Sequence, residues 1–160
     1  MRHTLANRIQ QAIEQAATMY WRLVLVVGPS GSGKTAALRA VHELTNAPMV
    51  NVSLELSQRL LALTERQRAL RLPHLMSEIV EALPSDVVLL DNIEVLFDAS
   101  FKQDPLRLLR GLSRNRTVVG AWPGFFDGKK LTYAVPCHPE YRQVDVQDLV
   151  VVSVDADQMG

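Results

Sequence analysis

The sequence has one cysteine and a formal net charge of zero, and each of these features excludes a class of protein. The single cysteine, Cys137, excludes an intrachain disulfide and fits a reducing compartment. The 17 Lys and Arg residues balance the 17 Asp and Glu residues, so no overall field attracts nucleic acid or an anionic membrane. Contact with either would therefore require a local patch of charge.

The sequence also has no long hydrophobic run. A transmembrane helix needs about 18 consecutive apolar residues, and polar residues such as Arg8 and Glu14 interrupt any signal-peptide core near the N-terminus. We therefore expect a cytoplasmic protein that makes no membrane contact. The length of 160 residues suits one hydrophobic core, so we expect a single domain over residues 1–160, with residues 1–22 as an N-terminal helix packed on it.

One motif of high specificity is present, at residues 28–35. Its sequence, GPSGSGKT, matches the phosphate-binding pattern G-x-x-x-x-G-K-[ST] at every fixed position. An apolar run over residues 23–27 precedes it and a helical pattern over residues 36–44 follows it, which is the strand, loop and helix order that the motif requires. The glycines let successive backbone N–H groups turn toward phosphate oxygens. The residues predicted to bind the nucleotide are Gly28, Pro29, Ser30, Gly31, Ser32, Gly33, Lys34, Thr35 and Ala36.

Three side chains predict the cofactors. Lys34 is placed to bridge the β- and γ-phosphates, and the Thr35 hydroxyl is placed to ligate Mg²⁺. Asp91 ends the hydrophobic run 86–91, and such a strand brings its carboxylate to the carboxyl edge of a parallel sheet, where it holds Mg²⁺ through water in the Walker B role. The guanine-reading motif Asn-Lys-x-Asp does not occur, so the predicted cofactors are ATP and Mg²⁺.

The residues that would support hydrolysis depart from what a fast ATPase needs. The position after Asp91 carries Asn92, whose amide can orient a water molecule but cannot accept its proton. Either turnover is slow or Glu94 reaches the site from the next turn; the alternative for Glu94 is a helix carboxylate that faces solvent. At the tip of the strand expected over residues 116–121, only the indole N–H of Trp122 or a backbone amide is available to the γ-phosphate. We therefore expect weak hydrolysis.

The remaining periodicity predicts two further helices and a hairpin. Residues 54–71 have a helical pattern, and Pro73 separates them from another helix over residues 74–83. In the first of these helices the residues expected to face the core are Leu54, Leu56, Leu60, Leu61, Leu63 and Leu70. Residues 127–130 predict the turn of a β-hairpin.

A stripe of arginines is the best candidate for an interaction surface. Asp104 and Pro105 are a typical cap and first residue of a helix, in which Arg107, Arg110 and Arg114 would share one face. This stripe is placed to contact DNA or the nucleotide of a neighbouring subunit. An ordinary solvated helix face is the alternative.

Taken together, these motifs resemble the ASCE group of P-loop ATPases, and in particular a small AAA+-like domain. More closely, the chain resembles the BrxF family, the small P-loop proteins of type 3 BREX bacteriophage-defence systems. The segments that carry the likeness are residues 28–35, 89–97 and 118–124. The resemblance implies an α/β fold: a three-layer α/β/α P-loop NTPase core with a mostly parallel five-stranded sheet, strand order 5-1-4-3-2, and no C-terminal helical lid.

The resemblance also implies roles and partners. It makes Lys34 and Thr35 phosphate and Mg²⁺ ligands and Asp91 the Walker B carboxylate. Relatives assemble as rings in which an arginine reaches the neighbour's γ-phosphate; Arg142 is at the matching place, with Arg114 and Arg116 as rivals. The implied partners are further copies of the chain, other BREX proteins and double-stranded DNA. The residues predicted to carry catalysis are Lys34, Asp91, Asn92, Glu94 and Arg142.

Two other functions remain open from the sequence. The P-loop also opens small-molecule kinases of nucleoside-monophosphate type, in which the basic residues 66–71 would mimic an acceptor lid. A non-catalytic, nucleotide-dependent scaffold is the other alternative, and Asn92 supports it.

Overall fold

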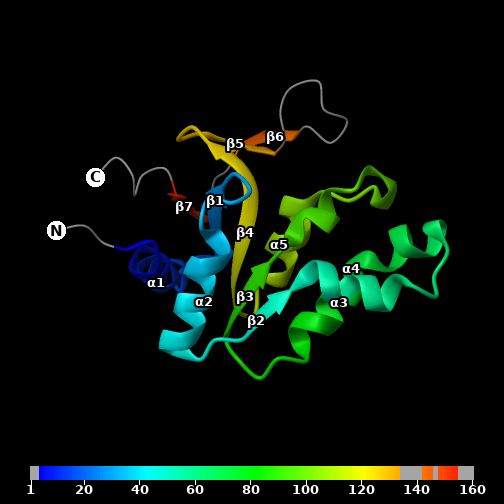
Figure 1. The fold of residues 1–160 in the computed structure, drawn as a ribbon, viewed down its shortest axis with the longest axis horizontal. Helices are drawn as coiled ribbons and strands as arrows, with labels where there is room; N and C mark the ends of the chain where they lie inside the picture. The colour runs from blue at the N-terminus through cyan, green and yellow to red at the C-terminus, as the bar shows by residue number, and fades with distance from the viewer. Residues whose placement is uncertain (1–3, 134–141, 146–147, 155–160) are drawn as a thin grey trace.

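The parallel strands follow the order that the sequence predicts. The structure, a computed structural model, describes residues 4–133, 142–145 and 148–154. Within them the chain forms a seven-stranded sheet, whose parallel part runs β2-β3-β4-β1-β7 (Figure 1). Read from the other edge, this is the predicted order 5-1-4-3-2, which is confirmed. The strands are β1 (Leu23–Gly28), β2 (Met49–Asn51), β3 (Val87–Asp91), β4 (Thr117–Phe126), β5 (Lys130–Tyr133), β6 (Arg142–Asp145) and β7 (Val150–Ser153).

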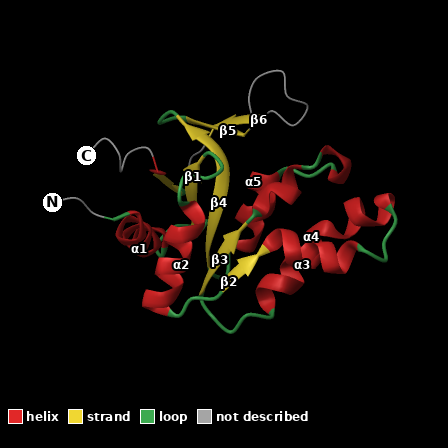
Figure 2. Cartoon of the chain, viewed as in Figure 1, coloured by secondary structure: helices red, strands yellow, loops and turns green. Residues whose placement is uncertain are grey.

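Helices cover both faces of the sheet, so the fold has the predicted three layers (Figure 2). The helices are α1 (Leu5–Ala16), α2 (Lys34–Thr45), α3 (Val52–Leu60), α4 (Glu65–Glu81) and α5 (Pro105–Leu112), with the 3-10 helices η1 (Ile93–Phe97) and η2 (Ala99–Phe101). Leu23 and Leu25 of β1 face a core shared with α3, α4 and α5, whereas Val24 and Val26 face one shared with α1 and α2. Burial on both faces explains why β1 is apolar throughout. No helix in the described ranges is long and apolar enough to cross a membrane.

The prediction that Pro73 separates two helices is wrong. The break lies earlier, between α3 and α4, where Thr64 and Gln67 form a reciprocal capping box that starts α4. Pro73 lies inside α4 and, having no N–H, leaves the carbonyl group of Ala69 without its helical partner. The side chain of Gln103 donates a hydrogen bond to this carbonyl oxygen at 3.0 Å. A tertiary contact therefore allows the helix to continue through the proline.

The expected core positions of this region are also partly wrong. Leu54, Leu61 and Leu70 are 54%, 78% and 72% exposed. The buried residues of α3 are Val52, Leu56 and Leu60, spaced by four, so a leucine two residues from Leu56 lies on the opposite side of the helix. Leu70 belongs to α4, whose own buried face begins at Leu72.

Strand β4 is longer than predicted and leaves the parallel sheet. It runs to Phe126, and its last residues pair antiparallel with β5 in the predicted hairpin, which β6 then extends. Figure 1 shows this ribbon rising beyond the edge at which β1 ends. The indole N–H of Trp122 does not face a ligand site, because Trp122 is buried and donates to the carbonyl oxygen of Thr132 at 3.2 Å. Of the two groups that the sequence left available to the γ-phosphate, the indole N–H is therefore engaged elsewhere and the backbone amide remains.

We predict that Gly124→Ala destabilises the protein, because a methyl group at this position would fall on the carbonyl oxygen of Thr132. The expected loss in the free energy of unfolding is about 1–3 kcal/mol, measured by urea denaturation. Gly111→Ala in α5 is the matched control, since nothing lies near a methyl group there, and it should stabilise by about 0.5–1 kcal/mol. Equal effects of the two substitutions would contradict the tight approach of β4 to β5.

Candidate phosphate-binding site

The loop between β1 and α2 has the conformation that the motif predicts. Gly31 and Gly33 have positive φ angles of 80° and 102°, which only glycine adopts without strain. Gly33 is also the N-cap residue of α2, so the loop passes directly into the first turn of the helix. The N-terminus of α2 therefore points its unpaired N–H groups into the loop, as phosphate binding requires.

Lys34 is buried inside this loop. It is 7% exposed, and its ammonium group donates hydrogen bonds to the carbonyl oxygens of Gly28 and, at 2.9 Å, of Pro29. Burial lowers the pKa of Lys34, while the carboxylates of Glu94 and Asp91 act in the opposite direction. The two carboxylates that the sequence singled out are therefore both close enough to act on the lysine.

Asp91 ends the hydrophobic strand β3, and Asn92 follows it as the first residue of a turn. Asp91 is buried, at 5% exposed, and lies opposite Asn51 of β2. Asn92 has a left-handed backbone with φ 53° and ψ 54°, which Asn tolerates better than most residues. Its carbonyl oxygen accepts a hydrogen bond from the backbone N–H of Ser53 at 3.2 Å. This turn starts η1, and η1 carries Glu94 to the site.

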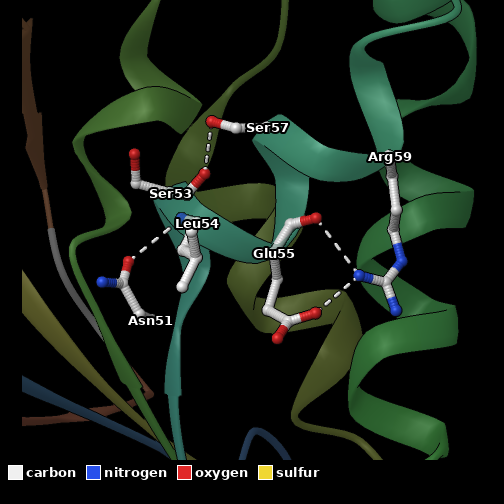
Figure 3. A network of polar contacts seen from close by, with 6 residues as sticks. All are labelled: Asn51, Ser53, Leu54, Glu55, Ser57 and Arg59. Carbon is white, nitrogen blue, oxygen red and sulfur yellow. Dashed lines mark hydrogen bonds and ion pairs between the residues drawn. The ribbon is translucent and has the colours of Figure 1, made fainter.

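A local polar network stabilises the start of α3 (Figure 3). Asn51 caps the helix by accepting a hydrogen bond from the backbone N–H of Leu54 at 3.1 Å, and Glu55 pairs with Arg59 at 2.7 Å. Because Ser53 in the same turn contacts Asn92, the first turn of α3 is anchored to the Walker B turn. Sequence reasoning did not assign Asn51, although a polar residue that ends a strand just before a helix is a cap signal.

A pocket of about 180 Å³ unites the two parts of the site. It is lined by Ser30, Gly31, Gly33, Lys34, Thr35, Ala36, Asp91, Asn92 and Glu94. Whole cofactors usually occupy about 300–1,000 Å³, so this pocket has room for a phosphate chain rather than a whole nucleotide. Among the predicted nucleotide-binding residues, Gly28 and Pro29 lie behind it as acceptors for Lys34. The hydroxyl oxygen of Ser32 is buried and has no hydrogen-bond partner.

These residues fit a phosphate chain with a divalent cation. The loop offers backbone N–H groups and the unpartnered Ser32 hydroxyl, and Thr35 and Asp91 bring two oxygen ligands of the kind that Mg²⁺ prefers into one pocket. No cluster of three or more His, Cys, Asp or Glu side chains that could hold a metal occurs among the described residues. Mg²⁺ would therefore take its other ligands from phosphate oxygens and water.

The predicted arginines lie away from this pocket. Arg116 donates hydrogen bonds to three carbonyl groups at the C-terminal end of α4, and Arg114 stacks over the ring of Tyr20 at 5.2 Å. Both residues precede β4 and so lie at the sheet edge opposite the phosphate-binding loop. Because α5 ends at Leu112, the prediction that Arg114 shares a helical face with Arg107 and Arg110 is wrong.

Arg142 and residues 66–71 are two further parts of the chain for which the sequence predicts a role. Arg142 begins β6, and its side chain lies outside the part of the chain that the structure describes. Residues 66–71, the alternative acceptor lid, lie on α4, and none of them lines the pocket. Within that group, Arg68 donates hydrogen bonds to the carbonyl oxygens of Leu60 and Leu63 at 3.0 and 3.1 Å, which closes the corner between α3 and α4.

Comparison with known protein families agrees with this geometry. Residues 24–118, more than half of the chain, match the family described as "ATPase family associated with various cellular activities (AAA)". The matched segment begins in β1 and ends in β4, so it contains the phosphate-binding loop and Asp91. No curated protein matches the chain. The arrangement of the site and the extent of the match lead to one conclusion: the chain belongs to the AAA family of P-loop ATPases.

Proposed function

We propose that this AAA-family protein binds ATP with Mg²⁺, hydrolyses it slowly, and assembles with further copies of itself when nucleotide is bound. The observation that carries the proposal is the single pocket that joins Lys34 and Thr35 at the start of α2 to Asp91 at the end of β3 and Glu94 of η1. A triphosphate needs a cation, a metal ligand and a carboxylate at one place, and these four residues supply them.

In the proposed bound state, the ammonium group of Lys34 turns from the carbonyl oxygens of Gly28 and Pro29 to the β- and γ-phosphates. It gains charged acceptors in place of neutral ones, and the backbone N–H groups of the loop bind the same phosphate oxygens. Thr35 and Asp91 hold Mg²⁺, which when bound neutralises charge between the β- and γ-phosphates. The base and ribose lie outside the pocket of about 180 Å³.

Slow hydrolysis follows from which groups are available to the attacking water. Asn92 cannot accept a proton, and its left-handed turn directs the chain into η1. Glu94 lines the pocket and is the carboxylate that we propose as general base. The indole N–H of Trp122 is engaged with Thr132, so no polar side chain from the tip of β4 assists. The site therefore has a base but lacks one of the usual contacts to the γ-phosphate.

We predict that Lys34→Ala weakens ATP binding at least about tenfold, since a hydrogen bond to a charged group is worth about 1.5–3 kcal/mol. Isothermal titration calorimetry with ATP and Mg²⁺ measures the dissociation constant. Lys102→Ala is the matched control, because Lys102 is exposed and does not line the phosphate pocket. Unchanged affinity in Lys34→Ala would overturn the assignment of the loop.

We predict that Glu94→Gln leaves ATP affinity near the wild-type value and slows single-turnover hydrolysis about 100-fold or more, as expected on losing a general base. Glu78→Gln, at a surface ion pair with His74 on α4, is the matched control and should hydrolyse normally. Rapid-quench measurement of phosphate release separates the outcomes. If the wild-type protein binds ATP and releases no phosphate above background, the non-catalytic scaffold is the better description.

The proposed partners are further copies of the chain, other proteins of a BREX bacteriophage-defence system, and double-stranded DNA. The BREX assignment is supported by the likeness of residues 28–35, 89–97 and 118–124 to the BrxF family.

Assembly is supported by the pocket, in which Lys34 is the cation among the lining residues, so a triphosphate would gain from an arginine of a neighbouring copy. For DNA, the supporting surface is a groove of about 480 Å³ between α4 and α5, lined by the exposed Lys102 and Arg107.

We predict that molar mass, measured by light scattering coupled to size exclusion, rises when ATP and Mg²⁺ are both added and returns with ADP. Nucleotide can drive assembly only if the assembled state binds it more tightly than the monomer does. Lys34→Ala should therefore keep the same mass under all conditions. A wild-type mass that does not respond to ATP and Mg²⁺ would remove the assembly proposal while leaving ATP binding intact.

A further inference from the structure

Three aromatic residues form a cluster beside the proposed catalytic pocket. Phe97 of η1 stacks on Tyr133 of β5, with ring centroids 3.9 Å apart and an interplanar angle of 23°. The same ring meets Trp122 of β4 edge to face, with centroids 4.8 Å apart and an angle of 79°. Phe97 and Trp122 are buried. The cluster therefore joins the element that carries Glu94 to the hairpin that extends beyond the sheet.

The hairpin side of this cluster is firmly built. The indole N–H of Trp122 donates to the backbone oxygen of Thr132, and Gly124 leaves no room for a side chain between the two strands. Leu131 is fully buried, and because side chains alternate along a strand, Tyr133 lies on the same inward face of β5. The ring of Tyr133 is therefore presented to η1 by a fixed backbone.

The η1 side places Glu94 between two anchors. At its start, the carbonyl oxygen of Asn92 accepts the hydrogen bond from Ser53, which ties the turn to α3. At its end, Phe97 is held by the aromatic cluster. Glu94 is exposed and Phe97 is buried, so the two side chains have different surroundings, but only two residues separate them on the same short 3-10 helix. A shift of Phe97 would therefore carry Glu94 with it.

We propose that Phe97, Trp122 and Tyr133 are positioning residues for ATP hydrolysis, which set Glu94 against the phosphate pocket through η1. This inference rests on the proposed function of Glu94 as general base. Tyr133 lies on β5, which pairs with β4 and β6 rather than with β1, so we expect the loss of its ring to change the rate of hydrolysis and not the affinity for ATP. At the tip of β4, where no polar side chain reaches the γ-phosphate, the ring of Trp122 instead packs against Phe97 of η1.

The test is a double-mutant cycle between Tyr133 and Glu94. Tyr133→Leu removes the stacked ring from a half-buried position, and Tyr133→Phe keeps it. We expect Tyr133→Leu to slow single-turnover hydrolysis about tenfold or more, because small displacements of a catalytic group have effects of that size. The ATP dissociation constant should stay within about threefold of the wild-type value, a change of less than about 1 kcal/mol. Tyr133→Phe should restore the rate.

The combined variant decides whether Tyr133 acts through Glu94. If it does, Tyr133→Leu with Glu94→Gln will be no slower than Glu94→Gln alone, because groups that act as a unit are not additive. If the losses in rate of the two single variants multiply in the double variant, or if Tyr133→Leu hydrolyses ATP at the wild-type rate, the inference is overturned while the proposed function stands. A wild-type rate in Glu94→Gln would instead overturn the role of Glu94 itself.

Two further variants separate positioning from a general loss of stability. Phe101→Leu makes a similar cut in the same hydrophobic core, in η2, which packs against α4, and should lower thermal stability without slowing hydrolysis. Trp122→Phe keeps one aromatic ring near Phe97 but loses part of the buried indole and its hydrogen bond to Thr132, so it should also slow hydrolysis and tests the cluster if Tyr133→Leu fails to fold. Equal slowing in Phe101→Leu and in the cluster variants would show a stability effect and contradict the inference.

Discussion

The burial of a charged lysine is the constraint on which the site depends. An ammonium group removed from water is costly unless it is paired and hydrogen-bonded. Lys34 finds two carbonyl oxygens in its own loop and two carboxylates, Asp91 and Glu94, near the end of another strand. The phosphate-binding loop alone therefore does not supply all the groups that stabilise the buried charge of Lys34. The sheet has to bring the end of β3 to the same place.

The strand order meets this requirement in a specific way. Strand β4 lies between β1 and β3, with Val119 paired to Val24 on one side and to Leu89 on the other. Two strand spacings put β1 and β3 about 10 Å apart, and because all three strands are parallel, the loop and Asp91 leave the sheet at one edge. The space between them above β4 is where the pocket forms.

The features that local sequence predicts are those with a local cause. The loop and the strand that ends at Asp91 were predicted because glycine geometry and apolar runs depend on neighbouring residues, whereas the order of the parallel strands was implied by the resemblance to P-loop ATPases. The break at Pro73 was mispredicted because the side chain that satisfies Ala69 comes from Gln103, far along the chain. Spacing left open whether Glu94 reaches the site or faces solvent, because the position of this residue depends on the left-handed turn at Asn92. In the structure Glu94 lines the pocket and is also exposed. The aromatic cluster joins three separate elements, so no local pattern contains it.

At the tip of β4, aromatic packing takes the place of a polar contact to the γ-phosphate. A polar side chain there would respond directly to the charge of the γ-phosphate. Trp122 instead turns into the core, where its ring meets Phe97 and its N–H binds the hairpin. Packed rings respond to displacement and not to charge, so nucleotide can affect the cluster by moving η1 or by moving β1, which places Val27 opposite Trp122 of β4. The same helix is tied to α3 through Asn92 and Ser53. Nucleotide at the pocket can therefore act on both the hairpin and α3 through η1, provided that η1 differs between the bound and the free state.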